Sequence, residues 1–327
     1  KTHCSIFSVN YAKNNLCNIL KKCIICGIVH VRLTKKELIM EKLIYGTEKY
    51  FNLKDMSLET YGVIPTEKFN VKEAIKNRVD YLKEFLKKTN MNGYVLGISG
   101  GVDSTTAGRL AQMACSELRN EGYQAQFIAV RLPNGVQKDE QDAQDAINFI
   151  NPDKLVTVNM EDAVNSIAEQ SLKEIINLGD NLTNSQFDFA RGNVAARARM
   201  TTQYFIAGAY SALVIGTDHS TEGITGFWTK WGDGACDLLV LNGLNKTQVR
   251  LVAKELNAPS KLYEKVATAD LETLRPGIPD EVALGISFKD LDAFLENKEI
   301  NSEVEYRIIK QFYITQHKRK NIPGFPG

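Results

Sequence analysis

Apolar positions recur at helical spacing soon after residue 70 of this chain. Ile75, Val79, Leu82 and Leu86 lie three or four residues apart, with lysines between them, which predicts an amphipathic helix. Beyond it, short apolar runs typical of buried strands alternate with helical patterns. This alternation predicts an α/β fold, a doubly wound parallel sheet with helices on both faces. We expect strands at 94–98, 126–132, 155–158 and 212–216 and helices at 105–120, 140–150, 161–178 and 193–209.

The first 55 residues have a different character, with no sustained period and no recognisable loop chemistry. We therefore expect an N-terminal extension of unknown role at 1–55 and one domain at 56–327. Met40 and Met56 are both plausible starts, and a chain that begins at Met56 is expected to fold and be active. Cys23 and Cys26 have CxxC spacing, but no second such pair accompanies them, so a metal site there is not favoured.

Composition narrows the class of protein. A chain of 327 residues with 43% hydrophobic residues can bury a sizeable core. The formal net charge of +1 argues against a nucleic-acid partner. The apolar run at 23–31 is shorter than the roughly 20 residues of a membrane span, and it lacks the flanks of a signal peptide. The six cysteines form no regular framework, so we expect reduced thiols, a cytoplasmic location and no membrane partner.

A glycine-rich turn joins the first predicted strand to its helix. It consists of Gly97, Ile98, Ser99, Gly100, Gly101, Val102, Asp103 and Ser104. Adjacent glycines let backbone N–H groups close around an anion, and the helix start adds unpaired donors. The turn lacks the Gly-Lys-Ser/Thr ending of a Walker A loop and resembles the SGGxDS pyrophosphate loop of the ATP pyrophosphatases. It predicts phosphate binding, and a turn without a ligand is the alternative.

Two carboxylates suggest a bound cation. Asp103 is out of place in an anion cradle unless a divalent cation accompanies the phosphates. The last predicted strand opens into six polar residues at 217–222, and Glu222 there would supply the second carboxylate. Mg²⁺ normally takes one or two protein carboxylates besides phosphate and water oxygens. A solvated loop with helix-capping residues is the alternative for 217–222.

The segment 226–237 interleaves glycines with aromatic and acidic residues. Such a composition is incompatible with a regular helix, so an ordered or lid-like loop is expected. A lid would keep water from a reactive intermediate. An edge hairpin with a glycine-rich tip is the alternative.

Several blocks together resemble the ammonia-dependent NAD synthetases. The resemblance runs from about Met56 to Lys320 and is carried by GISGGVDS, IAVRLPNGVQKDEQDAQ, FARGNVAARARM, GTDHSTEGITGFWTKWGDG, TADLETLRPGIPDEVALGIS and QHKRK. It implies an adenine nucleotide α-hydrolase type of fold and a homodimer. It also implies conversion of deamido-NAD, ATP and ammonia to NAD, AMP and pyrophosphate through an acyl adenylate, with Mg²⁺.

The same blocks imply roles for individual residues. Those matched to ATP are Gly97 to Ser104, Arg131, Thr217, Lys246 and Thr268, and those matched to Mg²⁺ are Asp103 and Glu222. Those matched to deamido-NAD are Arg197, Lys230, Asp237, His317 and Lys318, with Phe189 and Tyr204 as ring-stacking partners. Asp233 matches the acid that handles ammonia. Each cation, taken alone, would otherwise be assigned to a solvated surface.

Rival functions within the same superfamily are a GMP synthetase subunit and a tRNA-thiolating enzyme. Thiolation calls for cysteines near the nucleotide loop, and only Cys115 and Cys236 lie in the core region. The segment 226–237, which is the predicted lid, does not support a GMP synthetase. A protein that senses ATP without turnover is a further alternative, although such a protein would not need the Asp103 and Glu222 pair.

Overall fold

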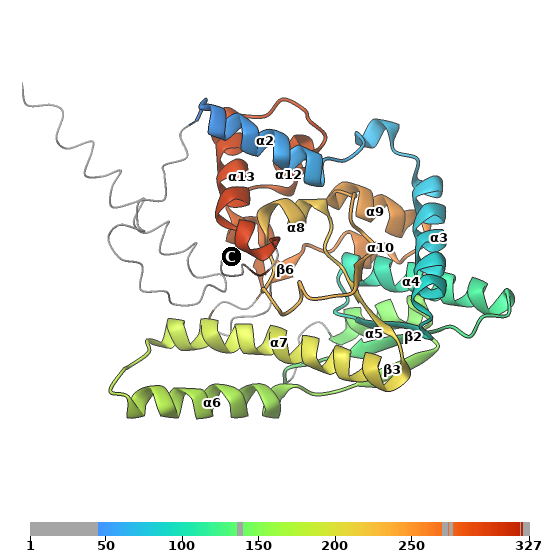
Figure 1. Ribbon diagram of the computed structural model, residues 1–327, viewed down its shortest axis with the longest axis horizontal. Helices are drawn as coiled ribbons and strands as arrows, with labels where there is room; N and C mark the ends of the chain where they lie inside the picture. The colour runs from blue at the N-terminus through green and yellow to red at the C-terminus, as the bar shows by residue number, and fades with distance from the viewer. Residues whose placement is uncertain (1–44, 136–139, 270–273, 275–276, 321, 323–327) are drawn as a thin grey trace, which may run out of the picture.

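A parallel sheet, as expected from the alternation of strands and helices, lies at the centre of the molecule. The computed structural model describes residues 45–135, 140–269, 274, 277–320 and 322 (Figure 1). Five parallel strands lie in the order β3-β2-β1-β4-β5. The strands are β1 (Gly93–Gly97), β2 (Gln126–Arg131), β3 (Lys154–Thr157), β4 (Leu213–Gly216) and β5 (Leu238–Leu239). The predicted fold class is thereby confirmed.

Alternate side chains along each strand enter two different hydrophobic clusters, as a sheet buried on both faces requires. Tyr94 and Leu96 join one cluster, whereas Val95 joins the other. The first cluster is completed by α3 (Val71–Thr89), α4 (Val102–Asn120), α5 (Glu140–Ile150), α9 (Lys246–Glu255) and α10 (Ser260–Tyr263). The second is completed by α6 (Glu161–Asn177) and α7 (Asn184–Tyr210), the two long helices that run side by side in Figure 1.

A third cluster is built from helices without the sheet. It joins α2 (Glu48–Tyr61), α8 (Ser220–Thr225), α12 (Phe288–Leu295) and α13 (Ser302–Ile314). The short elements are η1 (Thr66–Lys68), β6 (Thr268–Ala269), β7 (Ile278–Pro279), α11 (Asp280–Leu284) and η2 (Gln316–Lys318), and β6 pairs with β7 in antiparallel fashion. None of the helices in the described part combines the length and apolar character that crossing a membrane requires.

The expected boundary at Met56 falls inside α2 and needs correction. Tyr50 is fully buried, Leu53 is 7% exposed, and both belong to the third cluster. The Tyr50 hydroxyl donates a hydrogen bond to Glu305 at 2.6 Å. The packed unit therefore begins before Met56, because its first helix starts at Glu48. The CxxC of Cys23 and Cys26 lies outside the described residues.

Candidate active site

The two polar segments singled out in the sequence meet at the switch point of the sheet. Chain order runs outward from β1 to β2 and β3, then returns to place β4 on the other side of β1. Ligands in such sheets bind in the crevice beyond the carboxyl ends of the two strands that flank the reversal. The glycine loop follows β1 and the segment 217–222 follows β4, so both lie at this crevice.

The glycine loop has the geometry of a backbone cradle. Gly100 has a φ of +85° and lies so close to α5 that a Cβ there would come within 2.6 Å of the Ala143 nitrogen. Gly101 caps α4 without any side-chain hydrogen bond to the helix start, which leaves the first N–H groups open to an anion. The side chains of Ile98 and Val102 are buried in the core, so only their backbone can face a ligand.

Asp103 and Glu222 face each other across a buried lysine and histidine. The Lys246 Nζ donates to Asp103 Oδ2 at 2.7 Å and lies 3.9 Å from Glu222 Oε1. The His219 Nε2 lies 3.5 Å from a carboxylate oxygen of each acid and 3.3 Å from the Lys246 Nζ. The Lys246 and His219 side chains are at most 1% exposed. The pair of acids expected from the sequence is thus brought together, around a cation.

Burial and charge set the protonation of this group. Burial disfavours the charge on Asp103, but the attraction of Lys246 outweighs it and lowers the pKa of Asp103. Burial raises the pKa of Glu222 well above its usual value, against the pull of Lys246. Burial, together with Lys246, lowers the pKa of His219 to about 3. At neutral pH the imidazole is therefore uncharged, and the Asp103 and Lys246 pair carries the charge.

The donor set fits a hard divalent cation. Asp103 Oδ1 is buried and has no hydrogen-bond partner among the described residues. One ligand atom from each of Asp103, His219 and Glu222 lies within 4.8 Å of the others. Two carboxylate oxygens at the edge of a phosphate cradle are what Mg²⁺ uses alongside phosphate and water oxygens. A cation there would also favour ionised Glu222.

The predicted lid segment contains turns instead of a regular helix or strand between Gly226 and Asp237. The Asp233 carboxylate accepts a hydrogen bond from the Thr229 backbone N–H at 2.9 Å. Burial of the carboxyl group raises the pKa of Asp233, although the residue as a whole is exposed. Trp231 has a φ of +62°, which a non-glycine residue adopts only when its surroundings hold it there.

Two lysines tie this segment to the C-terminal region. The Lys230 Nζ donates to the His317 carbonyl at 2.7 Å, and the Lys318 Nζ donates to the Gly226 carbonyl at 2.8 Å. Arg197 on α7 donates to the Lys230 carbonyl at 3.2 Å. Four of the cations and polar residues matched to deamido-NAD therefore form one connected group.

Comparisons with known proteins agree with this geometry. The family model described as NAD synthase matches residues 74–322. The chain belongs to the NAD synthase family. The NH(3)-dependent NAD(+) synthetase of Aliivibrio salmonicida is 52% identical over 252 residues, 76% of this chain and 91% of that protein. The corresponding protein of Bacillus velezensis is 51% identical over 249 residues, 76% of this chain and 89% of its own.

Solved structures of this family share the architecture. The NAD+ synthetase from Burkholderia pseudomallei has a TM-score of 0.69 and 39% identity, covering 83% of this chain and 97% of its own. The NMN synthetase from Francisella tularensis has a TM-score of 0.67 and 30% identity, covering 79% of this chain and all of its own. The family resemblance drawn from the sequence blocks is therefore confirmed.

Other matched residues lie around the crevice in ways the sequence did not specify. The buried Arg131 guanidinium donates to the Ile98 carbonyl at 3.2 Å and to Glu140 at 2.6 Å. Thr217 directly follows β4, and the exposed Thr268 lies on the two-stranded β6–β7 sheet. These positions stay predictions as ATP contacts.

The aromatic residues matched to deamido-NAD do not converge. Roughly four turns of α7 separate Phe189 from Tyr204, about 22 Å along the axis. The Tyr204 hydroxyl lies 3.4 Å from Asp237 Oδ1, and Asp237 Oδ2 accepts from the Val214 backbone N–H at 2.7 Å. Asp237 therefore also holds the lid segment to the sheet. Phe189 and Tyr204 cannot stack on the two faces of one ring within one copy of the chain.

Sequence reasoning missed two residues of the site. His219 was present in the polar segment, but nothing in its spacing showed that it would be fully enclosed by Asp103, Glu222 and Lys246. Asp292 was missed altogether. It accepts hydrogen bonds from the Thr221 hydroxyl at 2.9 Å, the Lys246 backbone N–H at 3.2 Å and the Thr247 backbone N–H at 2.9 Å. It thereby fixes the start of α9, and no sequence signal links it to that helix.

Proposed function

We propose that this chain is a ligase that amidates deamido-NAD with ammonia at the expense of ATP, giving NAD, AMP and pyrophosphate, the last step of NAD biosynthesis. The observation that carries the proposal is the pairing of a backbone phosphate cradle with half-buried Asp103 and Glu222 and buried Lys246 at the switch point of an NAD synthase fold. About 50% identity to NH(3)-dependent NAD(+) synthetases supports the choice of substrates.

The first half-reaction activates a poor electrophile. The nicotinate carboxylate attacks the α-phosphorus of ATP, pyrophosphate leaves, and an acyl adenylate is formed. The loop from Gly97 to Ser104 holds the phosphates by backbone N–H groups, and Lys246 stabilises the charge that builds on the leaving group. A Mg²⁺ ion held by Asp103 and Glu222 would supply further charge neutralisation. Arg131, Thr217 and Thr268 complete the proposed ATP contacts.

The second half-reaction needs free ammonia beside the adenylate. Ammonium must lose a proton before it can attack the acyl carbon, and AMP then leaves. We assign this proton transfer to Asp233, whose raised pKa brings the carboxylate closer to the range of an effective base. The lid segment that carries it would exclude water from the adenylate.

Deamido-NAD is assigned to the connected polar group and to α7. Its anionic groups suit Arg197, Lys230, His317 and Lys318, and Asp237 adds a hydrogen-bond acceptor. Phe189 and Tyr204 offer ring surfaces at two separate places on α7. Because these lie far apart on one helix, each would stack on a different ring of the dinucleotide, or a second copy of the chain would contribute one of them.

We extend the proposal to a homodimer that works in the cytoplasm. Exposed apolar side chains on or near α6 and α7 support an interface there, namely Ile167 at 51%, Ile176 at 51%, Leu178 at 81% and Phe205 at 77% exposure. Sedimentation equilibrium measures the mass of the particle independently of its shape. A monomer at micromolar concentration would contradict the dimer.

The direct test incubates the full chain with ATP, MgCl2, deamido-NAD and ammonium chloride and quantifies products by chromatography. NAD, AMP and pyrophosphate are expected in equal amounts. Two further reactions extend the test. In one, nicotinate mononucleotide replaces deamido-NAD, and in the other, glutamine replaces ammonium. Preferred turnover of the mononucleotide would align the chain with the NMN synthetase it resembles at 30% identity. Equal turnover of glutamine in ammonia-free buffer would refute ammonia as the nitrogen source.

A further inference from the structure

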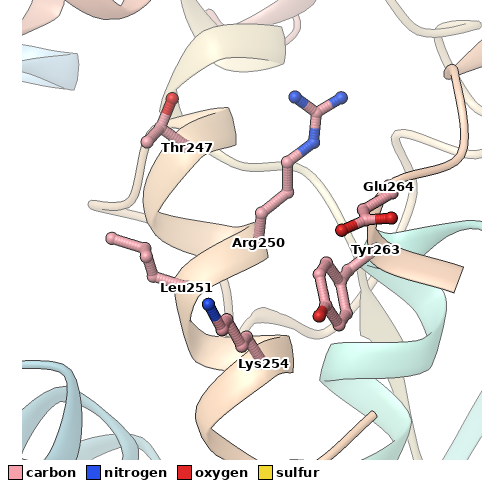
Figure 2. Close-up of a pocket in the computed structure, with 6 residues that line it drawn as sticks. All are labelled: Thr247, Arg250, Leu251, Lys254, Tyr263 and Glu264. Carbon is pink, nitrogen blue, oxygen red and sulfur yellow. The ribbon is translucent and has the colours of Figure 1, made fainter. Parts of the chain in front are cut away.

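A pocket between α9 and α10 contains cations that the proposed chemistry leaves unused. Its volume is about 380 Å³, and α9 carries Lys246 of the active site at its first position. The pocket is lined by Thr247, Arg250, Leu251, Lys254, Tyr263 and Glu264 (Figure 2).

Arg250 lies in this pocket without an ion pair to any residue that the structure describes. Its Nε is buried and has no hydrogen-bond partner among the described residues. Glu264 lines the same pocket, yet no ion pair joins it to Arg250 in that part of the chain. Figure 2 shows the guanidinium extending along α9 away from Lys254 and level with Thr247, toward the start of the helix. A guanidinium in this position has donors left for a ligand.

Arg250 shares one face of α9 with Lys246 of the active site. Arg250 lies four residues after Lys246, which places both on one face of α9. Two cations at this spacing repel each other and destabilise a helix. An anion bound between the two side chains during the reaction would relieve this repulsion.

We propose that Arg250 binds the outer phosphates of ATP and the pyrophosphate product, beside Lys246. The inference rests on the proposed function and adds a second cation to its leaving-group site. A guanidinium presents a planar fork that can donate two parallel hydrogen bonds to phosphate oxygens, whereas the Lys246 ammonium acts as a point charge. Arg250 would thus contribute to the binding of ATP and pyrophosphate but not of AMP, which has neither of the two outer phosphates.

Binding of inorganic pyrophosphate to the full chain, measured by calorimetry with MgCl2 and without turnover, tests the assignment. R250M keeps an unbranched apolar stem but removes the donors, and we expect pyrophosphate to bind about 10- to 100-fold more weakly, as for the loss of charged hydrogen bonds. AMP binding should stay unchanged. K254M is the matched control, because it removes the same charge from the same helix at an exposed position, and it should bind pyrophosphate as the wild type does.

Three outcomes would overturn the proposal: unchanged pyrophosphate affinity in R250M, equal weakening in R250M and K254M, or equal loss of pyrophosphate and AMP binding in R250M. R250Q is measured alongside and judged by the same criteria if R250M does not give a native circular dichroism spectrum. NAD synthesis by the wild type tests the proposed function separately, so a failure of that function is distinguishable from a failure of the Arg250 site.

Discussion

Two acids of the site differ in protonation although they lie close together. Asp103 is kept ionised by Lys246, whereas burial drives Glu222 toward its neutral form. The difference follows from distance, since the Lys246 Nζ is 2.7 Å from Asp103 and 3.9 Å from Glu222. Asp103 is therefore the residue at which a single change acts most directly on the cation and on the phosphates.

Replacing Asp103 by Asn should preserve the fold and remove most adenylation. Asn keeps an oxygen for Lys246 but deletes one of the charges that would hold Mg²⁺, so pyrophosphate release should fall at least about 100-fold. A single-turnover assay of pyrophosphate measures it, and higher Mg²⁺ should restore part of the rate. Asp180→Asn, an exposed change, should leave the rate intact. Release at the normal rate from Asp103→Asn would exclude Asp103 as a metal ligand.

Asp233→Asn should separate the two half-reactions. If Asp233 takes the proton of ammonium, its loss spares formation of the acyl adenylate and slows its capture by about 100- to 10,000-fold, the range for a general base. Single-turnover traces should show pyrophosphate at a normal rate while the adenylate accumulates, and raised ammonium should recover part of the NAD. A parallel fall of both half-reactions would place Asp233 in substrate binding or lid closure instead.

Asp218 should make stability depend on pH in the absence of ligands. Burial, with the charges of Asp233 and Asp103, raises its pKa from 3.8 to about 8. Between these values the folded chain holds a proton that the unfolded chain releases, so the free energy of unfolding contributed by this group falls as pH rises from about 4 to about 8. Urea unfolding at several pH values should show that slope in the wild type and a smaller slope in Asp218→Asn. Identical slopes would show that Asp218 titrates normally.

At the scale of elements, periodicity was informative where strands and helices are long enough to repeat. Strands β1, β2 and β4 lie within one residue of their predicted limits, and α7 is confirmed but starts at Asn184, nine residues early. Thr183 and Gln186 form a capping box at that start. The prediction from hydrophobic periodicity did not include this capping signal. Strand β5 has two residues, too few for a period. The burial of His219 and the role of Asp292 depend on contacts between segments that are far apart in the sequence. The spacing of residues within one segment cannot predict such contacts.

Arg319 links several elements around the site. Its guanidinium donates to the Gly223 carbonyl at 2.6 Å, the Ile224 carbonyl at 2.8 Å and the Phe312 carbonyl at 3.2 Å. It therefore joins the ends of α8 and α13 next to η2, which carries His317 and Lys318. The two residues matched to deamido-NAD owe their position to this contact.

Arg319→Met should loosen that connection. Loss of the charged donors to partly buried carbonyls should lower the free energy of unfolding by about 2–3 kcal/mol. The KM for deamido-NAD should rise more than the KM for ATP, because η2 lies on the deamido-NAD side of the proposed site. Urea unfolding and steady-state kinetics measure the two effects. Arg307→Met removes an exposed pair with Glu303 and should change both by little; equal effects in the two variants would contradict a specific role for Arg319.

At the scale of the whole molecule, the sheet and the helical cluster of α2, α8, α12 and α13 depend on each other. Helix α8 connects them, because it follows β4 in sequence and packs in the helical cluster through Ile224. Glu222 lies on this helix. A change that destabilises the helical cluster should therefore also disturb the position of Glu222 in the active site.

A chain that starts at Met56 tests this dependence. It lacks the first half of α2, so the buried Tyr50 and Leu53 are lost from the cluster. Large-to-small changes of this kind cost about 2–5 kcal/mol for each residue, and we expect marked loss of stability and activity. A chain that starts at Met40 retains all of α2 and is the control. Equal stability and activity of the two chains would show that the first half of α2 is dispensable, as the sequence pattern had predicted.

The contacts that assemble the site join residues far apart in the chain, with a sequence separation of 143 positions for Asp103 and Lys246 and of 96 for Gly223 and Arg319. By contrast, β1 and β2 pair across one helix. Because closure of longer loops costs more entropy, a refolding chain can recover much of its sheet while the crevice is still unassembled. Recovery of the circular dichroism signal during refolding therefore does not measure the recovery of enzyme activity.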